Sequence, residues 1–168
     1  DSAAVAAVDL AFWQIGSNLG RIEIPIDVTR IECLDPPIAR TSGGIVYRTA
    51  SDADLFEAKV IAILSRTFIE HRDLLDLHLF ASHAAADAAQ RLEDKLARIG
   101  IDRPAVHGRL GDLDRSATRH AKALDALIRG QLDPAASTTL LECGGGAAVL
   151  AGVRACLADL FDFRGGPP

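Results

Sequence analysis

The first fifty residues alternate between apolar and polar side chains in short stretches. RIEIPIDV (residues 21–28) alternates strictly, which is the period of a half-buried β-strand. GGIVYRTA (43–50) predicts another short strand, whereas residues 5–13 fit either a strand or the start of a helix. Residues 32–42 contain two successive prolines and predict a loop. We therefore expect a small amount of β-structure in this part of the chain.

From Ser51 onward the apolar period becomes that of an α-helix. Ser51 and Asp52 precede the first helical stretch and Asp54 follows, which places a capping residue and acidic side chains where a helix N-terminus favours them. The apolar stripe of this helix consists of Leu55, Val60, Ile63, Leu64 and Phe68. Four more helices are expected, over residues 71–83, 84–99, 104–129 and 133–161, with glycines 144–146 loosening or breaking the last.

These elements predict an α+β, mainly α fold. A small β-containing region spans residues 1–50 and a helical bundle spans residues 51–168, so the 168 residues form one average domain or two small ones. With 49% hydrophobic residues the chain can bury a sizeable core. Alanine and leucine dominate the composition, which favours helices.

Charge and cysteine content narrow the class of protein. A net charge of -5 argues against a broad, non-specific binder of polyanions, but it permits a local basic pocket for phosphates. Cys33, Cys143 and Cys156 lack CxxC spacing, so they predict idle thiols in a reducing cytoplasm rather than disulfides or a zinc site. No apolar run approaches the roughly 18–20 residues of a membrane span. We expect a cytoplasmic protein without membrane contact.

Four charged residues recur at a spacing that brings them together. Lys59, Arg66 and Asp73 are seven residues apart, and Asp76 lies one turn beyond, so one helix or two packed helices can gather them. Cations there suit phosphate oxygens, and a carboxylate can orient a lysine or accept a hydroxyl proton. The alternative is a solvated face on which Arg72 and Asp76 form an i,i+4 pair and the other cations face water.

The order KVIAILSR (59–66), then HRDLLDLHLF (71–80), resembles the signature of the AbiEii-type abortive-infection nucleotidyltransferase toxins. That family carries a lysine and an arginine on one helix and an (Arg/Lys)-Asp-x-x-Asp-Leu segment on the next. RIEIPIDV is similar to the family's strand bearing a third catalytic carboxylate, which is Asp27 here. The resemblance covers about residues 21–80, and the remaining helices agree in character only.

The resemblance implies that a nucleoside monophosphate is moved from an NTP to an acceptor hydroxyl, on a tRNA or a protein, with Mg²⁺. The catalytic residues it implies are Asp27 as the metal carboxylate, Lys59 as a phosphate contact and Asp73 as base or orienter. The substrate-binding residues are Arg66, a second phosphate contact, and Arg72 and Asp76, which brace the site. A cognate antitoxin protein is implied as a partner.

The chain departs from the family before this strand. The family's Gly-Ser turn, here residues 16–17, and its Asp-x-Asp strand are matched only weakly in this chain. Thr29 stands where the second acid of the strand belongs, and the gap between the turn and the strand is too short for a full helix and a strand. The chain is therefore expected to be the C-terminal portion of such an enzyme, or a degenerate relative. The alternative function is a non-catalytic helical interaction module that keeps the family scaffold.

Three other features invite functional readings. GGGAAVLAG (144–152) has no GKS or GKT, so close helix packing or a helix break explains it better than a phosphate loop. His71 lies beside the Arg-Asp pair and could assist there, although a hydrogen-bonded histidine is the commoner case. The fourth helix is locally basic and most simply a solvated face, with a weak RNA-facing surface as the alternative; its basic residues are Arg103, Arg109, Arg115, Arg119, His120 and Lys122.

Overall fold

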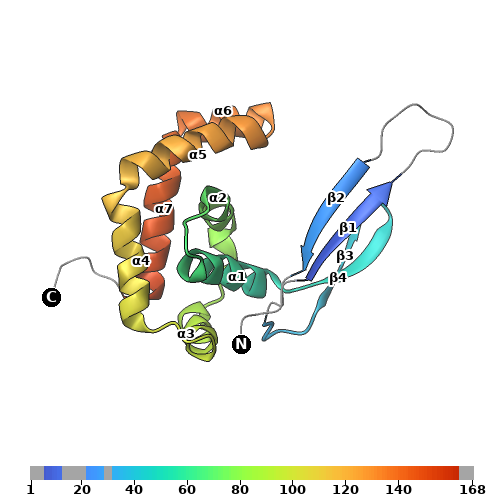
Figure 1. The fold of residues 1–168 in the computed structure, drawn as a ribbon, viewed down its shortest axis with the longest axis horizontal. Helices are drawn as coiled ribbons and strands as arrows, with labels where there is room; N and C mark the ends of the chain where they lie inside the picture. The colour runs from blue at the N-terminus through green and yellow to red at the C-terminus, as the bar shows by residue number, and fades with distance from the viewer. Residues whose placement is uncertain (1–5, 13–21, 29–31, 163–168) are drawn as a thin grey trace. The chain divides into compact units, whose positions relative to one another are not determined.

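The computed structural model describes residues 6–12, 22–28 and 32–162, and the chain divides into two compact units at residues 32 and 33 (Figure 1). The first unit contains strands β1 (Ala6–Phe12) and β2 (Ile22–Val28), which pair antiparallel with Ala7 opposite Asp27. Residues 5–13, which fitted two structures, thus include a strand, and the strand predicted at residues 21–28 is confirmed.

The second unit begins with a hairpin and continues into seven α-helices, a mainly helical fold as expected. Strands β3 (Ile38–Ser42) and β4 (Ile45–Thr49) pair antiparallel across Gly43 and Gly44, whose φ angles of 55° and 78° suit glycine. The loop predicted at residues 32–42 is wrong from residue 38 onward, because the prolines end at Pro37 and leave every later N–H free to pair. The second compact unit includes this hairpin and starts at residue 33, whereas the sequence had suggested a boundary at residue 50.

Helix α1 (Asp52–Ser65) starts as the sequence predicts. The hydroxyl of Ser51 accepts a hydrogen bond from the N–H of Asp54 at 3.0 Å, which caps the helix. The helix ends one residue before Arg66, whose backbone is extended, so the expected stripe stops there. Phe68, predicted on that stripe, is instead 78% exposed. Helix α2 (His71–Phe80) follows, with a single 3₁₀ turn after it.

Five further helices complete the second unit: α3 (Ala88–Arg98), α4 (Arg103–Arg115), α5 (Ala117–Gln131), α6 (Pro134–Glu142) and α7 (Gly145–Leu160). The single helix predicted over residues 104–129 is wrong, because the chain bends at Ser116, which ends α4 and begins α5. Both halves still bury apolar side chains in the one core, Leu113 from α4 and Leu124 from α5. A bend therefore lets both helices turn an apolar face inward.

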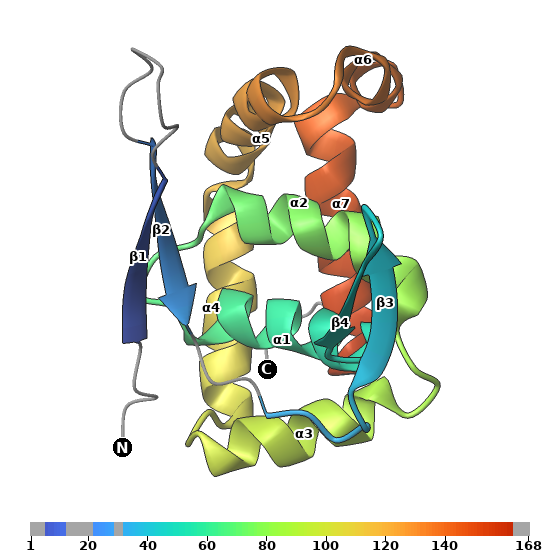
Figure 2. The same ribbon diagram turned by 90° about the vertical axis from the view of Figure 1, so that its right-hand side faces the viewer.

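Helices α1 and α2 lie side by side across α4 and α7, as Figure 2 shows. Their inward faces bring fully buried apolar side chains to the shared core, among them Phe56 and Val60 from α1, Leu74 and Leu77 from α2, and Val149, Val153 and Leu157 from α7. Burying one such side chain stabilises the fold by roughly 1.5–3 kcal/mol. The core thus fixes α1 and α2 against each other.

The glycines 144–146 break the last predicted helix, as expected. Gly144 adopts a left-handed φ of 105°, and α6 and α7 meet at 75°. Gly146 lies where a Cβ atom would stand 2.1 Å from the carbonyl oxygen of Ala121, so α7 packs directly on the backbone of α5. Among the described residues no single helix is long and apolar enough to cross a membrane; only the bent pair α6–α7, taken together, has the length and composition.

Replacing Gly146 by alanine should lower the free energy of unfolding by about 2 kcal/mol or more, because the new methyl group forces α5 and α7 apart. Gly108→Ala is the matched control: its position in α4 is helical and has open space around it. That substitution should stabilise the protein by about 0.5–1 kcal/mol. Urea unfolding of both variants checks this, and equal midpoints for the two would contradict the packing described.

Candidate functional site

Helices α1 and α2 bring four of the charged residues singled out above into contact. Lys59 Nζ lies 2.6 Å from Asp76 Oδ2 and 3.6 Å from Asp73 Oδ1, while Arg66 Nε lies 3.3 Å from Asp73 Oδ2. We call Lys59, Arg66, Asp73 and Asp76 the α1–α2 charge cluster. The helices do not run on as one, so the cluster forms by side-by-side packing, the second of the two routes that the spacing allowed.

The cluster combines a buried carboxylate with partly exposed cations. The Asp73 side chain is 8% exposed, whereas the Lys59 and Arg66 side chains are 35% and 52% exposed. Asp73 stands in the first turn of α2, where the helix dipole favours a negative charge. Its Oδ2 atom is buried and receives no hydrogen bond from the described residues, although Arg66 lies within ion-pair distance. A buried oxygen without a hydrogen bond is uncommon and leaves acceptor capacity unused.

This arrangement has a defined chemical capacity. Two partly exposed cations can turn from their carboxylates to the oxygens of an incoming phosphate, which are strong acceptors for lysine and arginine. Once the cations turn away, Asp73 has both oxygens available to accept a hydroxyl proton or to orient a donor. With no ligand the two positive and two negative charges cancel, so the cluster carries no net charge.

Arg72, another predicted site residue, lies outside the cluster. Arg72 is exposed and lines a groove between the start of α2 and α5, and it has no ion-pair partner among the described residues. The alternative pairing of Arg72 with Asp76 is therefore not found, since Asp76 pairs with Lys59. Asp27 lies in β2, and its side chain falls outside what the structure describes.

The described residues alone do not form a metal site. Within residues 6–12, 22–28 and 32–162, no three His, Cys, Asp or Glu side chains are placed to share an ion. Asp73 and Asp76 are each already paired with a cation. Cys33, Cys143 and Cys156 are free thiols in the structure.

His71 pairs with a second histidine instead of assisting Asp73. Its Nε2 atom lies 3.0 Å from Nδ1 of His120 on α5. Burial lowers the pKa of both imidazoles, and the nearby Arg119 lowers each further. Both are therefore neutral at pH 7, with one ring nitrogen donating the shared hydrogen bond and the other accepting it.

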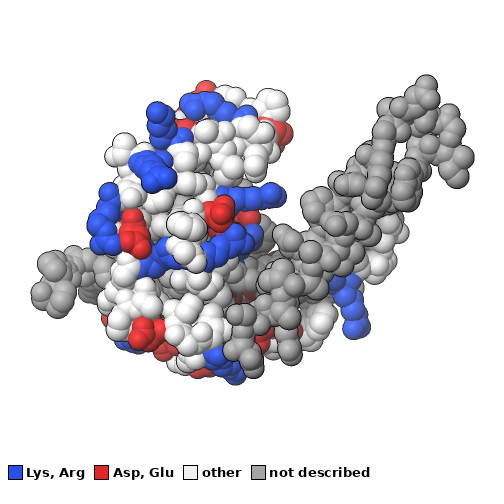
Figure 3. Space-filling view, viewed as in Figure 1, with Lys and Arg blue, Asp and Glu red and all other residues white. Residues whose placement is uncertain are grey.

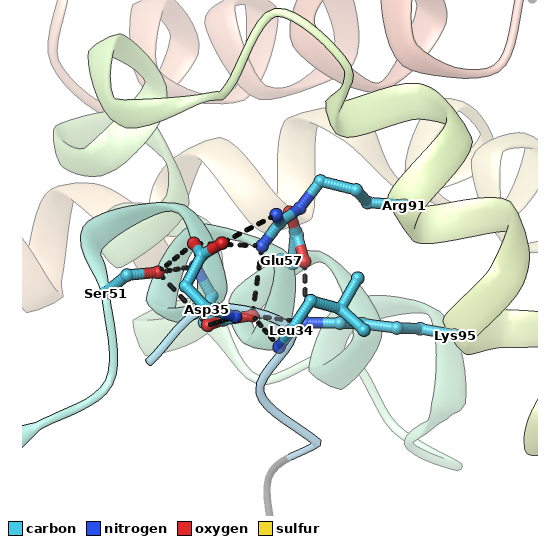
Figure 4. Close-up of polar contacts among 7 residues, drawn as sticks. Leu34, Asp35, Ser51, Glu57, Arg91 and Lys95 are labelled. Carbon is cyan, nitrogen blue, oxygen red and sulfur yellow. Dashed lines mark hydrogen bonds and ion pairs between the residues drawn. The ribbon is translucent and has the colours of Figure 1, made fainter. Parts of the chain in front are cut away.

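A second group of charges, which the sequence analysis missed, joins α1 to α3 (Figure 4). Lys95 Nζ lies 2.8 Å from Asp54 Oδ1 and 2.6 Å from Glu57 Oε2, and these two carboxylates have no exposed surface. Arg91 forms ion pairs with Asp54, Glu57 and Asp35. We call Asp35, Ser51, Asp54, Glu57, Arg91 and Lys95 the buried ion network.

The buried ion network also fixes the segment before the β3–β4 hairpin. The backbone N–H groups of Leu34 and Asp35 donate to Asp54 at 2.9 and 3.1 Å, and Ser51 Oγ donates to Asp35 at 2.6 Å. Burial raises the pKa of Asp54, but the hydrogen bonds from Lys95 and the two backbone groups outweigh it and bring the pKa to about 2. Asp54 is thus ionised at neutral pH.

We interpret the buried ion network as structural. Asp54 and Glu57 have no exposed surface, so an incoming ligand cannot reach them, in contrast to the partly exposed cations of the α1–α2 charge cluster. Glu57 Oε2, like Asp73 Oδ2, is a buried oxygen that receives no hydrogen bond from the described residues, but it lies 2.6 Å from Lys95 Nζ. One signal in the sequence pointed to it: Asp54 and Glu57 are spaced by three and Arg91 and Lys95 by four, a complementary pair of helical spacings.

Comparison with known proteins supplies no relative, since no family model, curated protein or solved structure matches the chain. A function can therefore be inferred only from the geometry of the α1–α2 charge cluster and from the motif that carries it. Both converge on Lys59 and Asp73.

Replacing Lys95 by methionine should lower the free energy of unfolding by about 3–5 kcal/mol, because it leaves two buried carboxylates short of a cation. Lys122→Met is the matched control, since Lys122 is exposed on α5, and it should change stability by less than about 0.5 kcal/mol. Urea denaturation followed by circular dichroism measures both. A loss below 1 kcal/mol for Lys95→Met would show that the network does not hold α1 to α3.

Proposed function

We propose that the α1–α2 charge cluster binds the phosphates of a nucleoside triphosphate, and that the protein acts as an AbiEii-type nucleotidyltransferase. The observation that carries this proposal is Asp73, a nearly buried carboxylate held beneath Lys59 and Arg66, with one oxygen that receives no hydrogen bond from the described residues. These residues occupy the places of the family's lysine, arginine and first motif aspartate. Phosphoryl transfer requires this mix, since it depends mainly on positioning and charge neutralisation.

The proposed reaction assigns a role to each member of the cluster. Lys59 and Arg66 exchange Asp73 for phosphate oxygens and neutralise the charge that develops on the transferred group. Asp73 then accepts the proton of the acceptor hydroxyl, whose oxygen bonds to the α-phosphorus as the bond to the bridging oxygen breaks and pyrophosphate leaves. Asp76, the closest partner of Lys59, holds the amine at the site.

Other parts of the proposal rest on the family resemblance. Mg²⁺ would accompany the NTP, since proteins bind triphosphates as magnesium complexes, with Asp27 as a metal carboxylate. Arg72 would brace the substrate from the exposed side of α2. The acceptor would be a tRNA or a protein, the partner an antitoxin protein, and the setting the cytoplasm.

A second candidate function is a non-catalytic helical interaction module. The mutual neutralisation within the α1–α2 charge cluster favours it, because ion pairs that are already satisfied can serve stability alone. Three successive apolar residues on β4 also favour it: Ile45 and Val46 are each 69% exposed and Tyr47 is 45% exposed. Exposed apolar side chains in a row suit contact with another protein.

A thermal-shift titration with ATP, GTP, CTP and UTP, each with and without Mg²⁺, separates the two functions. At a hundredfold excess over Kd, a nucleotide stabilises its protein by about 2.7 kcal/mol, which raises the Tm of a chain this size by about 5–10 °C. We expect such a Mg²⁺-dependent rise for at least one NTP, and its loss in Lys59→Ala.

Lys122→Ala is the control for the removal of a lysine charge, because Lys122 is exposed on α5 and should leave the nucleotide-dependent rise intact. The comparison uses the rise caused by nucleotide, so a change in the basal Tm of Lys59→Ala does not confuse it. The absence of a rise with all four nucleotides, or an equal rise in Lys59→Ala, would refute nucleotide binding at the cluster and favour the interaction module.

A further inference from the structure

A cavity of about 260 Å³ lies between the α1–α2 connection and helices α4 and α5. Phe68 and its neighbours in the connection line one side, and residues around Ser116, where α4 ends and α5 begins, line the other. We call this the α4–α5 cavity. None of the four residues of the α1–α2 charge cluster lines it, so its chemistry is separate.

The charges that line the α4–α5 cavity are mostly positive. Arg109, Arg115 and Arg119 face one acid, Asp112. Asp112 forms an ion pair with Arg115 and lies 4.0 Å from Arg109, whereas Arg119 is exposed and has no ion-pair partner among the described residues. Figure 3 shows basic side chains gathered over α4 and α5 on this side of the molecule. The cavity thus has an excess of cationic donors despite the acidic chain.

The uncharged lining adds hydrogen-bonding groups. His71 and His120 border the cavity and share a hydrogen bond between their rings. Because their pKa values are lowered, they bring no charge at pH 7 and contribute only nitrogen donors or acceptors. Ser116 adds a hydroxyl at the start of α5, where the helix dipole also favours an anion.

One aromatic ring stands at the edge of this basic cavity. Phe68 is 78% exposed, the highest value among the large apolar side chains of the described residues. The segment that carries it contacts α4, because Arg109 donates a hydrogen bond to the carbonyl oxygen of Thr67 at 3.5 Å. An exposed ring beside arginines is a combination that nucleic-acid-binding proteins use to stack a base while cations hold its phosphate.

We propose that the α4–α5 cavity binds a nucleoside phosphate, with Arg119, Arg109 and Arg115 on the phosphate and Phe68 under the base. Guanidinium groups match the geometry of phosphate oxygens, and an aromatic ring accepts any base. The volume accommodates a phosphate group and part of an attached ring. This site is distinct from the proposed NTP site, and it does not require that the protein transfer nucleotides.

Isothermal titration calorimetry with AMP in EDTA tests the cavity without Mg²⁺ and without a triphosphate. Arg119→Glu should weaken AMP binding at least tenfold, because it replaces the unpaired cation by an anion. Arg129→Glu makes the same charge change at an exposed position of α5 outside the cavity, and it should leave the affinity within twofold of wild type. Lys59→Ala should also bind AMP normally.

Phe68→Ala tests the base contact. It should weaken AMP about tenfold, in line with the loss of one base–aromatic stack, and leave the binding of inorganic phosphate unchanged. A short single-stranded oligoribonucleotide identifies the source of the nucleotide. Binding at least tenfold tighter than that of AMP assigns the cavity to a strand, and equal binding assigns it to a free nucleotide.

Three outcomes would overturn the proposal. The first is that wild type binds neither AMP nor the oligonucleotide in EDTA. The second is that Arg119→Glu and Arg129→Glu bind AMP equally, and the third is that Lys59→Ala loses AMP binding. The last would place the ligand at the α1–α2 charge cluster instead. Circular dichroism spectra that match wild type exclude misfolding, which is not expected because both Arg119 and Phe68 are exposed.

Discussion

Asp54 and Glu57 are carboxylates of α1 without exposed surface, and Lys95 and Arg91 of α3 supply the opposite charge. Since removing an unpaired ion from water costs several kcal/mol, arrangements of α1 and α3 that separate these groups are strongly disfavoured. The same carboxylates hold the segment that leads into the β3–β4 hairpin. Buried ion pairs and apolar packing therefore both fix the direction of α1. The direction of α1 in turn sets where the side chains farther along this helix lie.

The α1–α2 charge cluster uses the same residue types for a different purpose. There the carboxylate of Asp73 is buried while its cations are partly exposed, so a ligand can compete for Lys59 and Arg66 without unfolding the helices. Arg66 is the first residue after α1 and directly precedes the segment that lines the α4–α5 cavity. One short connection thus joins the proposed triphosphate site to the proposed nucleoside phosphate site.

The sequence correctly predicted those features that depend on residues close together along the chain. The period of the apolar residues located α1 and α2, Ser51 marked a helix start, and glycines 144–146 marked a break. The bend at Ser116 escaped prediction because it depends on how two helices share a core, and β3 because its pairing partner lies across a turn. The buried ion network was missed for a general reason: charged residues are nearly always solvated, and the helical spacings of its acids and cations do not say that the groups are buried. Spacing did anticipate the contacts among Lys59, Arg66 and Asp73.

Phosphorus-31 NMR of Mg²⁺–ATP reports on the phosphate groups themselves and so examines the function assigned to the α1–α2 charge cluster. The account predicts that wild type broadens and shifts the α-, β- and γ-phosphate resonances, that Lys59→Met abolishes these changes, and that Arg119→Glu retains them. Resonances that stay unchanged with wild-type protein, or that respond equally with Lys59→Met, would contradict it and leave Lys59, Asp73 and Asp76 as ion pairs that serve stability alone.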